Sequence, residues 1–248
     1  MNPTQPQGAS DWLFPPGSDF VEQIRAAQGR LLSAEEPGYR PGQLTVCLSR
    51  ETGSRGGTIA RRVAQLLDWD YYDQEKLEYL AQEAHLEQEL WLGLPAEARQ
   101  WAEQHLQQLV AQRRLSDHPS IQRLAHALLA IGCRGRAVIL GRGAGYVLPV
   151  ASTLLVRVVA PMGDRIRYMS EFLRLTEEQA RDYVYKTDRQ RLEFVLTHFG
   201  IDPNEVHQYD LVLNSSLLGV EACAQVIVTA ARYKQATLEQ EEESEAEA

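Results

Sequence analysis

Residues 44–67 read LTVCLSRETGSRGGTIARRVAQLL, and this stretch decides the fold. Its first five residues, LTVCL, are mostly apolar and rich in β-formers, which predicts a short buried strand. A glycine-rich segment follows, and apolar residues then recur at helical spacing over 58–67. A strand, a glycine loop and a helix in this order predict a site where backbone N–H groups and a helix N-terminus hold a phosphate.

The same alternation of short strands and helices continues along the chain. Further strands are predicted at 70–72, 137–140, 154–159 and 211–213. Helices are predicted at 74–114 with a break near 93–95, and at 119–131, 161–173, 176–199 and 219–233. Apolar strands that alternate with helices predict an α/β fold with a parallel sheet, in which ligands lie beyond the carboxyl ends of the strands.

Length and charge limit the classes of protein to which the chain can belong. With 248 residues, 44% of them hydrophobic, the chain is long enough for one large domain. Its net charge of −9 disfavours a nucleic-acid partner, although six glutamates among the last ten residues supply most of it. We expect a flexible arm rich in proline and glycine at 1–42, a domain at 43–233 and a disordered acidic tail at 234–248.

Cysteine usage and hydropathy give expectations about the cellular setting. Cys47, Cys133 and Cys223 lie far apart and form no CxxC pair, so we expect buried thiols and neither a disulfide framework nor a zinc cluster. The histidines show no metal-ligand spacing. No apolar run approaches the ~18–20 residues of a membrane span, and the N-terminus lacks the features of a signal peptide. We therefore predict a cytoplasmic protein without a membrane partner, and the sequence leaves its oligomeric state open.

The glycine loop carries the candidate phosphate-binding residues. These are Gly53, Ser54, Arg55, Gly56, Gly57 and Thr58. Thr58 is placed where a P-loop hydroxyl would reach Mg²⁺, and Arg50 and Arg55 add positive charge. The loop is not a complete P-loop motif, because Gly56 or Gly57 occupies the position of the lysine. The alternative interpretation is a tight turn with two solvated arginines.

Several blocks of sequence resemble the cytidylate kinase-like family. They comprise Ser49-Arg50, Gly53-Ser54, Ile59-Ala60-Arg61-Arg62 and Tyr71-Tyr72-Asp73, and further along 138–144 (VILGRGA), 158–161 (VVAP), 164–166 (DRI), 186–191 (KTDRQR) and 209–216 (YDLVLNSS). The resemblance covers about residues 44–232 in the right order. It implies a three-layer P-loop kinase-like fold, with a five-stranded parallel sheet around the P-loop strand. It also implies a helical nucleotide-binding insert at about 74–114 and a lid at about 184–200.

The resemblance also implies a reaction and its participants. The γ-phosphoryl group of ATP would be transferred to a nucleoside monophosphate, CMP or dCMP, with Mg²⁺ as cofactor. Phosphoryl transfer depends on positioning and on positive charge around the moving group. Arg50, our catalytic candidate, or alternatively Arg55 would then replace the missing lysine as a cation.

The resemblance assigns roles to residues of the acceptor site and the lid. Arg142 would contact the acceptor phosphate, and Asp73 matches an aspartate common in the family. Asp188 would bind the acceptor ribose and Arg191 would reach the phosphates. The alternatives are a surface arginine that caps a turn for Arg142, and an ordinary helix ion pair for Asp188 and Arg191.

The lid contains one further candidate and one departure from the family. Arg189 is a further catalytic candidate of the lid. Val184 stands where the family carries the first of two lid arginines, with Lys186 as a possible replacement.

Two other classes of function stay open from the sequence. The protein could bind a nucleotide or phosphate on the same fold without catalysis, as a regulator. It could also be a scaffold that acts through its N-terminal arm and acidic tail. A side chain of Arg50 or Arg55 that points at the phosphates would favour catalysis, whereas exposure of both to solvent would favour binding.

Overall fold

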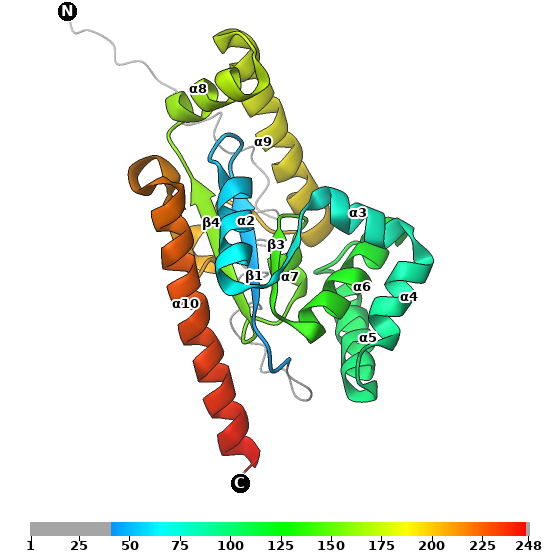
Figure 1. Ribbon diagram of the computed structural model, residues 1–248. Helices are drawn as coiled ribbons and strands as arrows, with labels where there is room; N and C mark the ends of the chain where they lie inside the picture. The colour runs from blue at the N-terminus through cyan, green and yellow to red at the C-terminus, as the bar shows by residue number, and fades with distance from the viewer. Residues whose placement is uncertain (1–40, 247–248) are drawn as a thin grey trace, which may run out of the picture. The chain divides into compact units, whose positions relative to one another are not determined.

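The structure is a computed structural model that describes residues 41–246, without the side chains of 84–87, 242, 243, 245 and 246. The predicted arm at 1–42 therefore lies almost wholly outside the described residues. A five-stranded sheet forms the centre of the domain (Figure 1). Its strands are β1 (Thr45–Arg50), β2 (Asp70–Tyr72), β3 (Ala137–Leu140), β4 (Thr153–Val159) and β5 (Leu211–Asn214).

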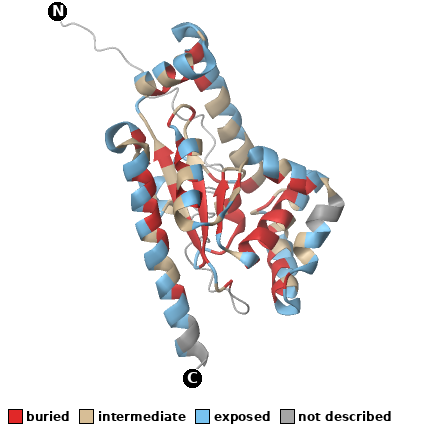
Figure 2. Cartoon of the chain, viewed as in Figure 1, coloured by how far each residue is buried: buried red, intermediate tan, exposed pale blue. Residues whose placement is uncertain are grey.

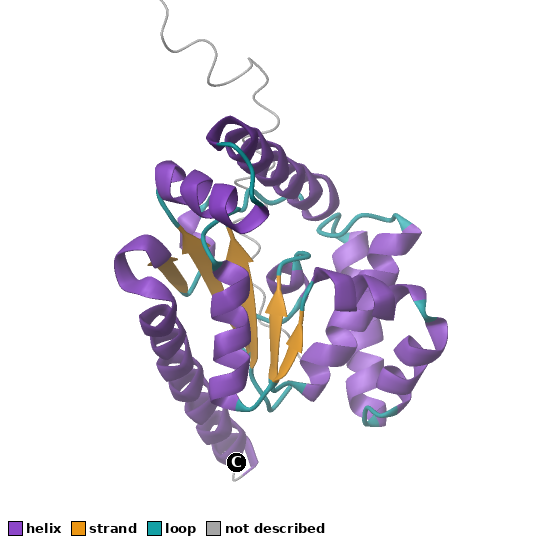
Figure 3. Ribbon diagram, turned by 45° about the horizontal axis from the view of Figure 1, so that its top comes forward, coloured by secondary structure: helices purple, strands orange, loops and turns teal. Residues whose placement is uncertain are grey.

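The sheet is parallel throughout and its order is β2-β3-β1-β4-β5. The strand before the glycine loop, β1, is thus central, with Val46 opposite Val138 of β3 and Leu154 of β4. Helices connect the strands and lie around the sheet (Figure 3). The predicted α/β fold with a five-stranded parallel sheet is confirmed, and all carboxyl ends meet at one edge.

Successive side chains of β1 point to opposite faces of the sheet, one toward the hydrophobic core and the other toward a cavity. Val46 and Leu48 are buried in the main hydrophobic core with Ile59 of α2 (Gly56–Leu67) and Ile227 of α10 (Ser215–Ala246). The intervening Cys47 is directed toward a cavity at the other side of the strand. Buried residues concentrate in the strands and on the inner faces of the helices (Figure 2).

The segment predicted as a broken helix at 74–114 consists of three helices. They are α3 (Gln74–Gln82), α4 (Ala84–Leu92) and α5 (Ala96–Ala111), which pack against α6 (Pro119–Arg134). Asp73 caps α3 by accepting a hydrogen bond from the N–H of Lys76, at 3.1 Å. Pro95 precedes the first turn of α5, where the chain bends after Gly93.

Two helices form a hairpin between β4 and β5. They are α8 (Met162–Leu173) and α9 (Glu177–Phe199), and a short helix α7 (Ala144–Val147) follows β3. Thr176 and Gln179 form a capping box at the start of α9, and Gly200 ends the helix with a φ of 66°. The 3₁₀ turn η1 (Val206–Gln208) leads into β5.

The last helix extends further than the sequence predicts. The expected helix ends at residue 233 and a disordered tail follows, but α10 continues to Ala246. The extra turns are held by the start of β1, because the Gln235 side chain accepts from the N–H of Leu44 at 2.7 Å and donates to the carbonyl of Gly42 at 3.1 Å. Leu238 is buried in the main core. None of the helices within residues 41–246 is long and apolar enough to cross a membrane.

Candidate functional site

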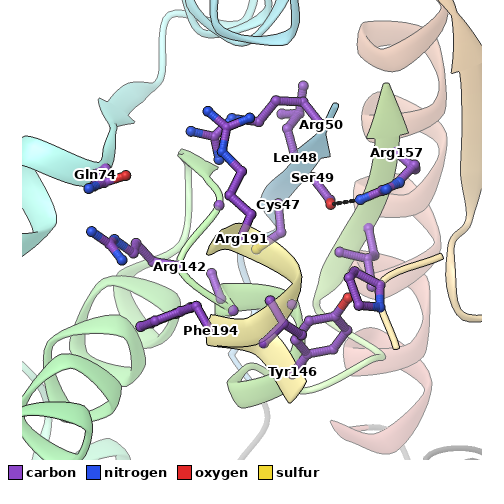
Figure 4. A pocket seen from close by; sticks show the side chains of 17 residues that line it. Cys47, Leu48, Ser49, Arg50, Gln74, Arg142, Tyr146, Arg157, Arg191 and Phe194 are labelled. Atoms are coloured by element: carbon purple, nitrogen blue, oxygen red, sulfur yellow. Dashed lines mark hydrogen bonds between the residues drawn. The ribbon is translucent and has the colours of Figure 1, made fainter. Parts of the chain in front are cut away.

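A small cavity of about 80 Å³ lies at the carboxyl ends of the central strands (Figure 4). Four arginines line it: Arg50 at the end of β1, Arg142 just after β3, Arg157 on β4 and Arg191 on α9. No aspartate or glutamate is among the described residues that line this cavity. An enclosure lined by guanidinium groups without carboxylates favours an anion, and a phosphate above all.

Arg50 packs against the glycine loop. Its side chain packs between two glycines, since a Cβ atom on Gly56 or Gly141 would collide with it. Burial and, to a smaller extent, the neighbouring guanidinium groups of Arg191 and Arg142 lower the pKa of Arg50 to about 9. Arg50 therefore carries its charge at neutral pH in surroundings that disfavour this charge. A bound anion would compensate it, as is typical of anion-binding sites.

Arg142 stands in a turn of unusual backbone geometry. Gly141, Arg142 and Gly143 all have positive φ angles, of 78°, 57° and 72°. An L-residue in this region costs about 1 kcal/mol or more, and such strain is common at ligand sites. The guanidinium lies over the ring of Phe194 at 4.9 Å and donates to a carboxylate oxygen of Glu78. Burial and the charge of Arg191 lower the pKa of Arg142.

The other two arginines are held by hydroxyl groups. Arg191 donates to the hydroxyl of Thr52 at 3.1 Å, and burial lowers its pKa while the charge of Asp188 opposes this. Arg157 donates to the hydroxyl of Ser49 at 2.7 Å. The sequence-based candidates do not include Arg157, although a lone charge within the apolar strand LLVRVV is a signal that could have identified it.

The glycine loop leads directly into the N-terminus of α2. Arg55 is the N-cap in a left-handed conformation, with a φ of 59°, and no described side chain caps the helix. The first N–H groups of a helix have no partner within it, so this N-terminus can bind an anion. The guanidinium of Arg55 lies over the ring of Tyr168 at 5.0 Å, on the outside of the loop. Of the two arginines that could meet a phosphate, Arg50 lines the cavity and Arg55 is exposed.

A carboxylate of α9 is bonded to the glycine loop. One oxygen of Asp188 accepts from the N–H of Thr52 at 2.8 Å and from its hydroxyl at 2.6 Å. The other oxygen accepts from buried Arg165 at 2.5 Å, and Arg165 also lies 3.5 Å from Glu51. Asp188, to which the family resemblance assigns the acceptor ribose, thus ties α9 to the loop here. The sequence-based candidates include neither Arg165 nor Glu51.

The structure places three other residues of the predicted site or lid outside the cavity. Arg189 is 79% exposed and pairs with Glu193 at 2.7 Å, because two residues along a helix turn a side chain by about 200° from Arg191. Asp73 caps α3 and pairs with Arg61 at 3.5 Å. Val184 is fully buried against α8, which explains why no arginine stands at this position.

A family comparison agrees with this geometry. The model of the cytidylate kinase-like family matches residues 45–217, which span all five strands and the glycine loop. The chain belongs to this family. The resemblance seen in the sequence is thereby confirmed, and the protein is a nucleotide kinase-like protein of P-loop kinase-like fold.

One solved structure shares the fold of this cytidylate kinase-like protein, and a second has a lower similarity. An uncharacterized protein from Eubacterium ventriosum is 14% identical, covers 77% of this chain and 99% of its own, and superposes with a TM-score of 0.54. A shikimate kinase from Bacteroides thetaiotaomicron is 13% identical over 76% of this chain and 98% of its own, with a TM-score of 0.43. Among curated proteins, a uronate isomerase from Corynebacterium glutamicum is 30% identical over 92 residues. That match covers 37% of this chain and only 18% of the isomerase.

The residues of this cytidylate kinase-like protein can be tested against ATP and Mg²⁺. The uncapped N-terminus of α2 and the close approach of Gly56 to Arg50 fit a phosphate chain. Within residues 41–246 no group of three His, Cys, Asp or Glu side chains could hold a metal alone. Mg²⁺ at phosphoryl-transfer sites keeps several waters and is bound by substrate phosphates with one or two protein ligands, and exposed Thr58 on the first turn of α2 can provide one.

Proposed function

We propose that this protein transfers the γ-phosphoryl group of ATP to a nucleoside monophosphate, with CMP and dCMP as the first candidates. One observation carries the proposal. The cavity lined by Arg50, Arg142, Arg157 and Arg191 lies beside the glycine loop at the carboxyl ends of the strands, and no described carboxylate lines it. Ligands of parallel α/β sheets bind at this edge.

The arginines have different roles in this reaction, some in binding the acceptor and one in stabilising charge. Arg142 and Arg191 hold the acceptor phosphate, since planar guanidinium groups bind phosphate oxygens through two parallel hydrogen bonds. Arg50 supplies the charge that the missing lysine provides elsewhere, because it joins the strand end to the loop. Positive charge placed before the reaction starts stabilises the charge of the moving phosphoryl group.

The glycine loop binds the phosphates of the donor. The backbone N–H groups of Gly53 and Arg55, together with those of Gly56, Gly57 and Thr58, provide donors for their oxygens, and Ser54 holds the loop in shape by donating to the carbonyl of Glu51 at 2.8 Å. Bound Mg²⁺ would neutralise part of the phosphate charge, with Thr58 as its protein ligand. Asp188 is available to the acceptor ribose once it leaves Thr52.

The test is ADP release by the purified protein with Mg-ATP and a panel of CMP, dCMP, UMP, AMP and GMP. We expect turnover with CMP or dCMP, and a loss of at least a hundredfold in kcat/KM in Arg142→Ala, on the order of the loss of one transition-state charge contact. Arg232→Ala is the matched control, because Arg232 lies exposed on α10, outside the cavity lining. Absence of turnover with every acceptor would refute the kinase function.

A non-catalytic phosphate-binding function is the second candidate. Two observations favour it: the loop lacks the lysine, and Asp188 occupies the N–H of Thr52. The same experiment separates the two functions. Nucleotide binding that depends on Arg142, together with no ADP release for any acceptor, would establish the binding function.

A further inference from the structure

Glu78 reaches an arginine of the cavity although it does not line the cavity itself. Its carboxylate forms an ion pair with Arg142, one of the four arginines of the lining. Glu78 also accepts a hydrogen bond from the side chain of Gln74 at 3.2 Å. Gln74 lines the cavity and lies one turn earlier on α3, so Glu78 is held in place from its own helix.

Glu78 lines a second cavity of about 320 Å³ together with Arg123 and Ile121. This cavity shares Arg142 and Phe194 with the arginine cavity. The Glu78 side chain is 44% exposed, whereas that of Arg142 is 19% exposed. The carboxylate can therefore turn away into solvent, while Arg142 is fixed by its left-handed backbone and by Phe194.

We propose that Glu78 occupies Arg142 in the free protein as an internal substitute for the acceptor phosphate. On this basis Glu78 lowers the affinity of the acceptor site for anions, and a doubly charged phosphate overcomes this competition better than a singly charged anion does. A phosphate monoester carries about −1.5 to −2 charges and three acceptor oxygens, whereas the carboxylate carries one charge and two oxygens. The phosphate thus displaces Glu78, but singly charged anions do so poorly. The proposal rests on the proposed function, since it requires an acceptor phosphate at Arg142.

The decisive variant is Glu78→Gln, which keeps the length of the side chain and an oxygen acceptor but removes the charge. We expect its dissociation constant for inorganic phosphate and for CMP to fall by about three- to tenfold, because the phosphate no longer competes with a partly exposed charged contact, which is of modest strength. The affinity for cytidine, which has no phosphate, should not change. Glu75→Gln is the matched control, because it removes the same charge from the exposed face of the same helix.

Glu78→Asp provides a second test that does not depend on the loss of charge. The shorter side chain holds its carboxylate further from Arg142, so phosphate should again bind more tightly than to the wild type. Isothermal titration calorimetry at fixed ionic strength would measure all of these affinities, since salt screens such contacts.

Each result has a defined meaning. Tighter phosphate binding in both Glu78 variants, with Glu75→Gln unchanged, would support the proposal. Unchanged or weaker phosphate binding in Glu78→Gln, while Arg142→Ala loses binding, would overturn it and leave the proposed acceptor site intact. Equal binding of CMP by the wild type and Arg142→Ala, or no binding by any variant, would overturn both.

Discussion

Replacement of Arg50 by methionine should make the ligand-free protein more stable. Methionine keeps the apolar length of the side chain between Gly56 and Gly141 and removes the charge. Burial lowers the pKa of Arg50 to about 9, well below the usual range of an arginine, and one pKa unit corresponds to about 1.4 kcal/mol, so the charged form is disfavoured by a few kcal/mol in the folded chain. Since the Arg50 side chain is partly exposed, solvent screening reduces this destabilisation.

We expect Arg50→Met to gain about 1–2 kcal/mol in the free energy of unfolding, which raises Tm by roughly 2–6 °C in a protein of this size. The gain should depend on pH. Above pH 9 the folded chain loses the Arg50 proton while the unfolded chain still keeps it, so the wild type recovers stability as the pH rises through 9. The advantage of the variant is therefore complete below pH 9 and shrinks above it.

Urea unfolding at pH 7 and pH 10, with and without inorganic phosphate, measures both effects. Phosphate should stabilise the wild type more than Arg50→Met, because a ligand stabilises only the folded state that binds it. Arg232→Met, on the exposed side of α10, should stay within about 0.5 kcal/mol of the wild type. If Arg50→Met is less stable than the wild type by about 1 kcal/mol while this control is unchanged, the charge of Arg50 does not destabilise the folded protein and the reasoning is refuted.

Three further predictions concern other parts of the domain. Asp188→Asn should destabilise the protein by about 3 kcal/mol in urea unfolding, because it leaves the buried charge of Arg165 without its nearest partner; unchanged stability would contradict the role given to this ion pair. Gly143→Ala should lower the free energy of unfolding by about 2–4 kcal/mol, because the φ is 72° and a Cβ would meet the ring of Phe199. Gly163→Ala, with nothing near its Cβ, should be neutral or slightly stabilising, and equal Tm changes in the two variants would refute this reasoning. At pH 8 a thiol reagent should react slowly with the native protein, whereas all three thiols should react rapidly after unfolding. The reason is that burial raises the pKa of Cys133 to about 12 and also raises the pKa values of Cys47 and Cys223. Three rapidly reacting thiols in the native state would contradict this prediction.

The strands and the glycine loop are the parts that the sequence predicts well. Apart from the short β2, each strand is a largely apolar run bounded by glycine or polar residues, so its position depends on local composition. The end of α10 is different, because Gln235 and Leu238 are fixed by contacts with segments some 190 residues earlier or with the core. A charge-rich tail gives no local signal for such contacts, and tertiary packing overrides its composition.

The candidate site is predictable to the extent that the topology determines it. Arg50 ends one parallel strand and Arg142 closely follows another, and the carboxyl ends of such strands lie at the same edge of the sheet. The rotation of α9 about its axis is a tertiary property, so the sequence cannot decide which of Arg189 and Arg191 faces the cavity. The partners Glu78 and Arg165 stand on helices whose packing angles are likewise set by the assembled core.

The central position of β1 has a consequence for biosynthesis. Its neighbours β3 and β4 are encoded roughly 90 and 110 residues further along the chain. During synthesis on the ribosome, β1 stays unpaired until both neighbouring strands have emerged. At about 5–20 residues per second this takes some ten seconds. Parallel strands that are far apart in sequence pair slowly, and until they pair their apolar side chains and free backbone groups are exposed to aggregation. Yield in cells should therefore depend on chaperones and growth temperature more than the stability of the finished fold would indicate.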